Sequence, residues 1–183
     1  MSNIEIFLEH QSNNMKLFSA ALLSIMAIFF LSADTDDLTP FPSIKVKKLN
    51  GEAVDLQSYA KNGKITIVSF WATWCKPCVS ELNAIADYYE EWQDEYDVEL
   101  IAVSVDDQRT APRIKGVVNS NSWEYEILHD VNGKSYRTFN FQNIPYTALV
   151  NQEGNIVYKH NKYSPGDEEE LLEKIEEIAS GSK

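Results

Sequence analysis

Cysteine is scarce in this sequence, which has two cysteines among 183 residues. They are Cys75 and Cys78, only three positions apart, so a framework of several structural disulfides is excluded. A bridge between them would close a very small loop and would remove little entropy from the unfolded chain. A reversible redox reaction therefore explains the pair better than a structural crosslink does.

Basic residues and histidines are also few. The chain has 16 Lys and Arg against 28 Asp and Glu, a net charge of −12. This balance argues against a nucleic-acid partner, which favours a basic surface. None of His10, His129 and His160 stands at the spacing from the cysteines that a four-ligand zinc site requires. We therefore predict no metal site, and we interpret His129 and His160 as surface or structural residues.

Only one stretch is long, uncharged and rich in apolar and small residues, from Leu17 to Ala33. With Lys16 before it and Ala33 before the expected cleavage point, residues 1–33 are predicted to be a signal peptide or an N-terminal membrane anchor. The stretch is at the short end for an anchor. No cysteine stands directly after this stretch, which excludes a bacterial lipid anchor. A start at Met15 would give a more usual signal, so residues 1–14 are interpreted as a mis-called start or an extension.

The rest of the chain alternates between strand and helix patterns. Residues 34–40 are polar and contain proline, which predicts a linker, and Asn50-Gly51 predicts a hairpin turn. We expect strands at 44–49, 53–55, 65–71, 98–105, 125–128, 146–150 and 155–158, and helices at 56–59, 76 to 92 or 94, 110–119, 134–139 and 167–178. Such an order predicts an α/β fold with a central mixed sheet flanked by helices.

The cysteine pair stands where a buried strand ends and a helix begins. Residues 65–71 are apolar at nearly every position, and an apolar stripe of helical spacing follows Cys78. The first turn of a helix carries partial positive charge and unpaired N–H groups, which stabilise a thiolate. Two thiols placed three residues apart there can also close a disulfide ring. The pattern indicates a redox couple.

With these elements in place, the chain resembles the thioredoxin fold and, within it, the TlpA/ResA group of exported thiol–disulfide oxidoreductases. The most specific part is Phe70-Trp71-Ala72-Thr73-Trp74-Cys75-Lys76-Pro77-Cys78, and Ile144-Pro145 matches the place of a cis-proline that faces the cysteines. The resemblance implies a thioredoxin-like domain at 41–180, with an N-terminal β-hairpin extension and an insert before the cis-proline strand.

The resemblance also implies roles for particular residues. Cys75 would attack the substrate disulfide and Cys78 would resolve the mixed disulfide. Glu81 matches a buried carboxylate of the group, and it would handle the proton because Ser69 stands where thioredoxin has an aspartate. The alternative is that Glu81 is an ordinary exposed helical glutamate.

The substrate groove is expected around Ile144, Pro145 and Trp74. The backbone before the cis-proline would pair with an incoming peptide. Trp74 would form an apolar edge of the substrate groove. Trp71 ends the core strand, and its side chain is expected to pack in the core. Lys76 would favour the thiolate modestly, or it is an ordinary surface lysine.

Several functions are compatible with such a site. The leading hypothesis is an extracytoplasmic reductant of protein disulfides, with apocytochrome c as one candidate client, recharged by a membrane electron donor and using no cofactor. A disulfide oxidase or isomerase is the nearest alternative, and a copper-binding chaperone is one from a different class. A peroxidase is disfavoured because Val68 and Ala72 replace the Pro and Thr of the peroxiredoxin motif.

Overall fold

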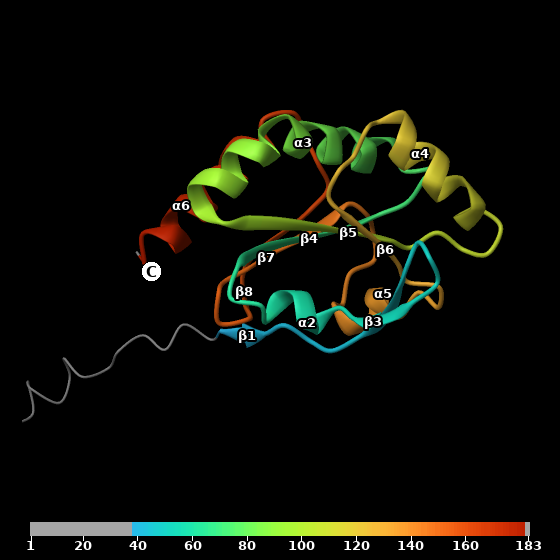
Figure 1. Cartoon of the computed structure of the whole chain (residues 1–183), viewed down its shortest axis with the longest axis horizontal. Helices are drawn as coiled ribbons and strands as arrows, with labels where there is room; N and C mark the ends of the chain where they lie inside the picture. The colour runs from blue at the N-terminus through green and yellow to red at the C-terminus, as the bar shows by residue number, and fades with distance from the viewer. Residues whose placement is uncertain (1–37, 182–183) are drawn as a thin grey trace, which may run out of the picture. The chain divides into compact units, whose positions relative to one another are not determined.

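The computed structural model describes residues 38–181, and its centre is one eight-stranded mixed sheet with the order β1-β8-β7-β4-β5-β6-β2-β3 (Figure 1). The strands are β1 (Thr39–Pro40), β2 (Lys45–Lys48), β3 (Ala53–Asp55), β4 (Ile65–Trp71), β5 (Val98–Ser104), β6 (Glu126–His129), β7 (Tyr146–Val150) and β8 (Asn155–Asn161). The helices are α2 (Gln57–Ala60), α3 (Lys76–Tyr96), the 3₁₀ turn η1 (Ala111–Arg113), α4 (Ile114–Ser120), α5 (Lys134–Thr138) and α6 (Asp167–Ala179). The predicted α/β thioredoxin fold is confirmed.

Strand β4 lies at the centre of this sheet. All seven of its residues are buried, as its continuous apolar run predicts for a strand covered on both faces. It pairs in parallel with β5 and antiparallel with β7. Alternate β4 residues therefore face opposite helix layers, and the chain leaves the end of this rigid strand directly into the cysteine motif.

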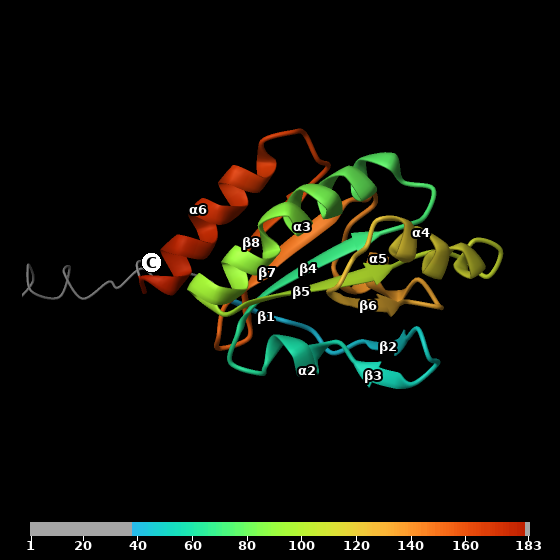
Figure 2. The same cartoon turned by 45° about the horizontal axis from the view of Figure 1, so that its top comes forward.

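Helices cover both faces of the sheet. Helices α3, α4 and α6 lie on one side, and α2 and α5 lie on the other (Figures 1 and 2). Helix α3 is longer than expected and ends at Tyr96, where the C-cap residue Asp97 adopts a left-handed conformation with φ of 52°. Its buried stripe extends to Trp92, and the partly buried Tyr96 continues it, which explains the extra turn.

The predicted N-terminal hairpin is present and belongs to the main sheet. Strands β2 and β3 pair antiparallel on either side of the Asn50-Gly51 turn, and β2 also pairs with β6, Lys47 opposite His129. The predicted insert between β5 and Pro145 consists of η1, α4, β6 and α5. The hairpin thus closes the edge of the sheet that this insert builds.

Besides the longer α3, two segments differ clearly from the prediction. Thr39 and Pro40 form strand β1, which pairs with Ile156 and Asn155 of β8, although we expected a linker there. The adjacent Phe41 is fully buried and packs against Phe139, and this contact holds Thr39 and Pro40 beside β8. Strand β8 also continues three residues beyond its predicted end at Tyr158, to Asn161.

The predictions for residues 1–33, and for 34–37 of the linker, lie outside the described residues. Within residues 38–181, none of the helices combines the length and the apolar composition that a bilayer span requires.

Candidate active site

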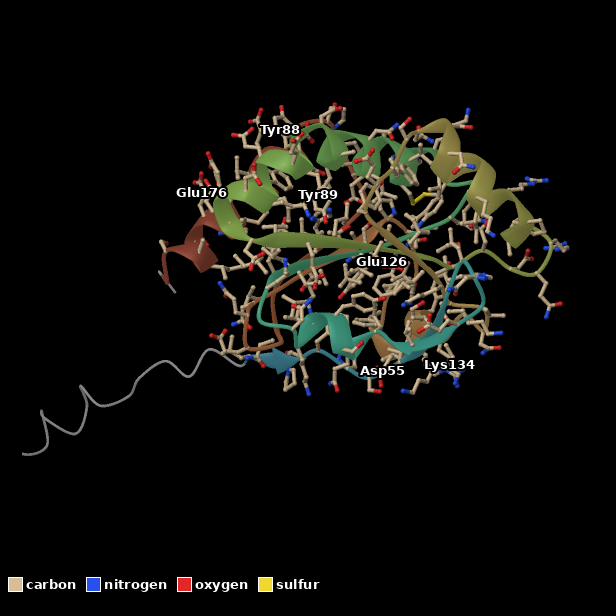
Figure 3. The ribbon with its side chains drawn as sticks, in the orientation of Figure 1. Asp55, Tyr88, Tyr89, Glu126, Lys134 and Glu176 are labelled. Atoms are coloured by element: carbon tan, nitrogen blue, oxygen red, sulfur yellow. A yellow bond between two sulfur atoms is a disulfide. The ribbon has the colours of Figure 1, made fainter. Side chains whose placement is uncertain are left out.

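The two cysteines form a disulfide at the N-terminal end of α3 (yellow bond in Figure 3). Cys75 is the N-cap residue, and its Sγ accepts a hydrogen bond of 3.3 Å from the backbone N–H of Cys78. Pro77 occupies the first turn, where its missing N–H costs no hydrogen bond. Both cysteine residues are buried, Cys78 more completely than Cys75. The helix end can therefore stabilise a thiolate on Cys75 once the disulfide is reduced.

The loop before β7 faces this disulfide. The peptide bond between Ile144 and Pro145 is cis, as the resemblance implied. The carbonyl oxygen of Ile144 lies 3.8 Å from Cys75 Sγ. Two segments that are distant in the sequence thus meet at Cys75. Trp74, the residue before Cys75, is 58% exposed, so its indole ring is accessible beside the disulfide.

Glu81 lies one turn after Cys78 on α3 and is only 2% exposed, so the exposed alternative is wrong. Its Oε2 accepts a hydrogen bond of 3.0 Å from Ser69 Oγ, and its Oε1 accepts one of 2.8 Å from Thr147 Oγ1. His160 Nε2 lies 2.8 Å from the same Oε1. A buried carboxylate requires such partners, and here the sheet supplies all three.

The register of the sheet explains this arrangement. Ser69 of β4 is paired with Thr147 of β7, and Thr147 is paired with His160 of β8. Residues paired across neighbouring strands point to the same face. The three polar side chains therefore form a row beneath α3, and Glu81 reaches down to all of them.

The interpretation of His160 as a surface or structural residue missed its contact with Glu81. Burial of the ring opposes protonation, but the hydrogen bond and charge of Glu81, helped by Asp167 and Glu170, raise the pKa of His160 above its ordinary value. A sequence signal for this contact was available, because a strand that includes both Tyr158 and His160 places their side chains on the same face of the sheet. The predicted strand ended at Tyr158, so His160 was not assigned to that face.

Residues 38–159 match the AhpC/TSA family, which is more than half of the chain. This chain belongs to the AhpC/TSA family. Within that family it is a thioredoxin-like thiol–disulfide oxidoreductase related to ResA, which confirms the resemblance to the TlpA/ResA group.

Two curated oxidoreductases and one solved structure are similar to this chain. Sporulation thiol-disulfide oxidoreductase A of Bacillus subtilis (strain 168) is 27% identical over 159 residues, which cover 85% of this chain and 93% of the relative. ResA of Bacillus thuringiensis subsp. konkukian is 27% identical over 135 residues, 73% of this chain and 75% of the relative. The solved structure of an uncharacterized thioredoxin-like protein from Porphyromonas gingivalis has a TM-score of 0.70 and 41% identity, and covers 78% of this chain and 94% of that one.

In this family member, a second buried carboxylate holds the segment that precedes the disulfide. Asp106 follows β5, and its carboxylate accepts hydrogen bonds from the backbone N–H of Thr73 at 2.9 Å and from Thr73 Oγ1 at 2.7 Å. We assigned no role to Asp106 from the sequence. The contact joins the chain after β5 to the chain after β4 and so fixes the approach to Cys75.

The structure therefore brings Cys75, Cys78 and Ile144 into direct contact and places Glu81 behind them. Among the described residues, no group of three or more His, Cys, Asp and Glu side chains could hold a metal ion.

Proposed function

We propose that this protein is exported and reduces disulfides in other proteins through Cys75 and Cys78. The observation that carries the proposal is the disulfide at the start of α3, in contact with the Ile144 carbonyl oxygen and next to the exposed Trp74. An extended substrate strand would pair with the backbone at Ile144 beside Pro145. Trp74 would cover the apolar part of the substrate.

The proposed reaction transfers two electrons from the dithiol to the substrate disulfide. The Cys75 thiolate attacks one substrate sulfur, forms a mixed disulfide and releases the other sulfur as a thiolate. The Cys78 thiol then gives its proton to Glu81 and attacks Cys75 Sγ. This step releases the second substrate thiolate and forms the Cys75–Cys78 disulfide. The released thiolates take up protons from solvent.

The charge of the site supports reduction over oxidation. A strong oxidant stabilises its reduced, thiolate form. Here the carboxylate of Glu81 and the net charge of −12 oppose additional negative charge, while one backbone N–H reaches Cys75 Sγ. Pro77 within the pair and Ile144 before the cis-proline also resemble reducing members of the superfamily.

The proposed setting is the periplasm or cell envelope, with the protein either secreted or held by its N-terminal segment. The Leu17–Ala33 stretch and the resemblance to an exported group support this location. A reductant in an oxidising compartment must be recharged, so we propose a membrane electron donor as one partner and disulfide-containing proteins as the others. Apocytochrome c before haem attachment is one candidate client.

Equilibration with glutathione buffers tests the direction of the reaction. We expect a midpoint potential closer to the about −270 mV of thioredoxin than to the about −120 mV of a strong oxidant. The fraction of reduced protein can be measured by alkylation and mass spectrometry. A potential near that of the strong oxidant would instead support the oxidase or isomerase alternative.

A further inference from the structure

A groove lined by basic residues lies between strand β2 and the start of helix α4. Its volume is about 450 Å³, and the turn after β2, η1 and the chain around the end of β6 complete it. None of the described residues that line this β2–α4 groove is acidic, and the basic ones are Lys47, Lys48, Lys115 and His129. A concave surface with one sign of charge attracts ligands of the opposite sign.

Two of these lysines are not neutralised within the part of the chain that the structure describes. Lys47 and Lys115 are exposed and form no ion pair there, whereas Lys48 pairs with Glu52 at 3.3 Å. The acidic residues are concentrated elsewhere, and helix α6 begins with four of them in a row, 167–170. In a protein of net charge −12, the groove is therefore a local reversal of sign that is complementary to carboxylates.

Apolar side chains line much of the rest of the groove. They include the half-buried Leu49 and Val131 and the proline of η1, Pro112. A free anion or a flat lipid surface would leave these side chains without contacts. A peptide segment that carries both acidic and apolar side chains would use the lysines and the apolar lining together.

The groove lies at the same edge of the sheet as the disulfide. Strands β4, β5 and β6 run parallel, so their carboxyl ends share one edge, where Cys75 follows β4 and His129 ends β6. His129 Nε2 contacts the backbone carbonyl oxygen of Asp106 at 2.8 Å, and the Asp106 carboxylate accepts the N–H of Thr73, two residues before Cys75. Figures 1 and 2 show α4 and the β2–β3 hairpin at the same end of the sheet as the start of α3.

The order of the strands gives the distance between the two sites. Neighbouring strands lie about 4.8 Å apart, so β6 and β2 are about 10 and 14 Å from β4 along the sheet. An extended peptide spans about 3.3 Å per residue. When one of its cysteines is at Cys75, residues about three or four positions away reach the groove. The other arm of the peptide runs towards Ile144, because β7 lies on the opposite side of β4.

We propose that the β2–α4 groove is a substrate-docking site, which selects disulfide-containing proteins with acidic residues about three or four positions from the reacting cysteine. The inference rests on the proposed reduction of protein disulfides. Lys47 and Lys115 contact the substrate carboxylates, and apolar side chains of the same segment pack on Leu49 and Val131. The net charge of the protein opposes acidic substrates in general, so a preference for them requires a local cationic site.

Disulfide-linked peptide dimers with one central cysteine per chain are the probes. The third and fourth residues on both sides of the cysteine are Glu in one peptide and Gln in the other. The second-order rate constant of the reduced protein with each peptide is divided by that of dithiothreitol, which corrects for the reactivity of the peptide itself. We expect the Glu peptide to react about tenfold faster at low ionic strength. This advantage should disappear towards 1 M salt, where the Debye length is about 3 Å.

The double variant Lys47→Glu with Lys115→Glu should lose the preference for the Glu peptide. Its rate with the Gln peptide should be unchanged, which also shows that the variant is folded. Lys61→Glu with Lys159→Glu is the matched control, because it changes the net charge equally at two exposed lysines outside the groove. Lys61 precedes β4 and Lys159 lies in β8, on the far side of the sheet from β2. The control should keep the preference.

Equal rates for the two peptides would overturn the docking role and leave the reduction of disulfides standing. A preference that survives in the double variant would also overturn it and would assign the preference to another cation, such as the exposed Lys76 beside Cys75. If the reduced protein reacts with neither peptide, the proposed function fails, and the docking role fails with it. Binding to phosphatidylglycerol vesicles that only the double variant loses, without any peptide preference, would overturn the proposal in favour of an anionic membrane.

Discussion

Replacing Cys75 with serine is expected to abolish protein-disulfide reduction, with a loss of at least about 10³-fold in rate. Cys75 is the N-cap of α3, and its sulfur receives the N–H of Cys78 and contacts the Ile144 carbonyl oxygen. The more deeply buried Cys78 lacks this access to a substrate. A serine hydroxyl is not ionised at neutral pH and cannot attack a disulfide. Steady-state reduction of a disulfide-containing protein substrate measures the loss.

Cys78→Ser is the matched control for this first prediction. It should also fail in steady-state turnover, but it should retain a single attack by Cys75 at close to the normal rate. Retained single attack in Cys75→Ser together with its loss in Cys78→Ser would reverse the assigned roles.

Glu81→Gln is expected to lower the turnover rate by about 100-fold, the usual contribution of a general acid or base. The amide has the same shape as the carboxyl but neither accepts nor releases a proton near neutral pH. Because Glu81 lies one turn after Cys78 and away from the substrate face, KM should change little. The kinetic constants of the variant, measured with the same substrate protein, test this separation.

Glu99→Gln is the control for this second prediction. Glu99 of β5 is also partly buried and accepts hydrogen bonds from Asn62 and Thr66, but it contacts no residue of the site. It should keep normal turnover. The free energy of unfolding of both variants, measured in urea, shows whether the loss in Glu81→Gln comes from chemistry. A rate reduced in proportion to the unfolded fraction would contradict a proton-transfer role.

Most of the fold could be predicted because local patterns determine it. The apolar run of β4, the Asn50-Gly51 turn and the amphipathic α6 each carry their own periodicity or turn chemistry. The cysteine spacing likewise indicated the redox site without reference to the rest of the chain. The family resemblance contributed the cis-proline and the burial of Glu81, which no local pattern requires.

The sequence could not predict what depends on register and on contacts between distant segments. The row of Ser69, Thr147 and His160 exists only because β4, β7 and β8 pair as they do. Strand β1 forms because Phe41 packs against Phe139, almost one hundred positions away. Asp106 meets Thr73 for a similar reason. Each of these contacts requires the folded sheet before it can be seen.

Trapping of the mixed disulfide tests the central claim most directly, namely that Cys75 attacks and Cys78 resolves. The Cys78→Ser variant, incubated in its reduced form with an oxidised peptide that carries one disulfide, should hold the peptide covalently. Mass spectrometry after proteolysis should place the new bond on Cys75. A stable adduct on Cys78 in the Cys75→Ser variant, with none on Cys75 in the Cys78→Ser variant, would contradict the mechanism.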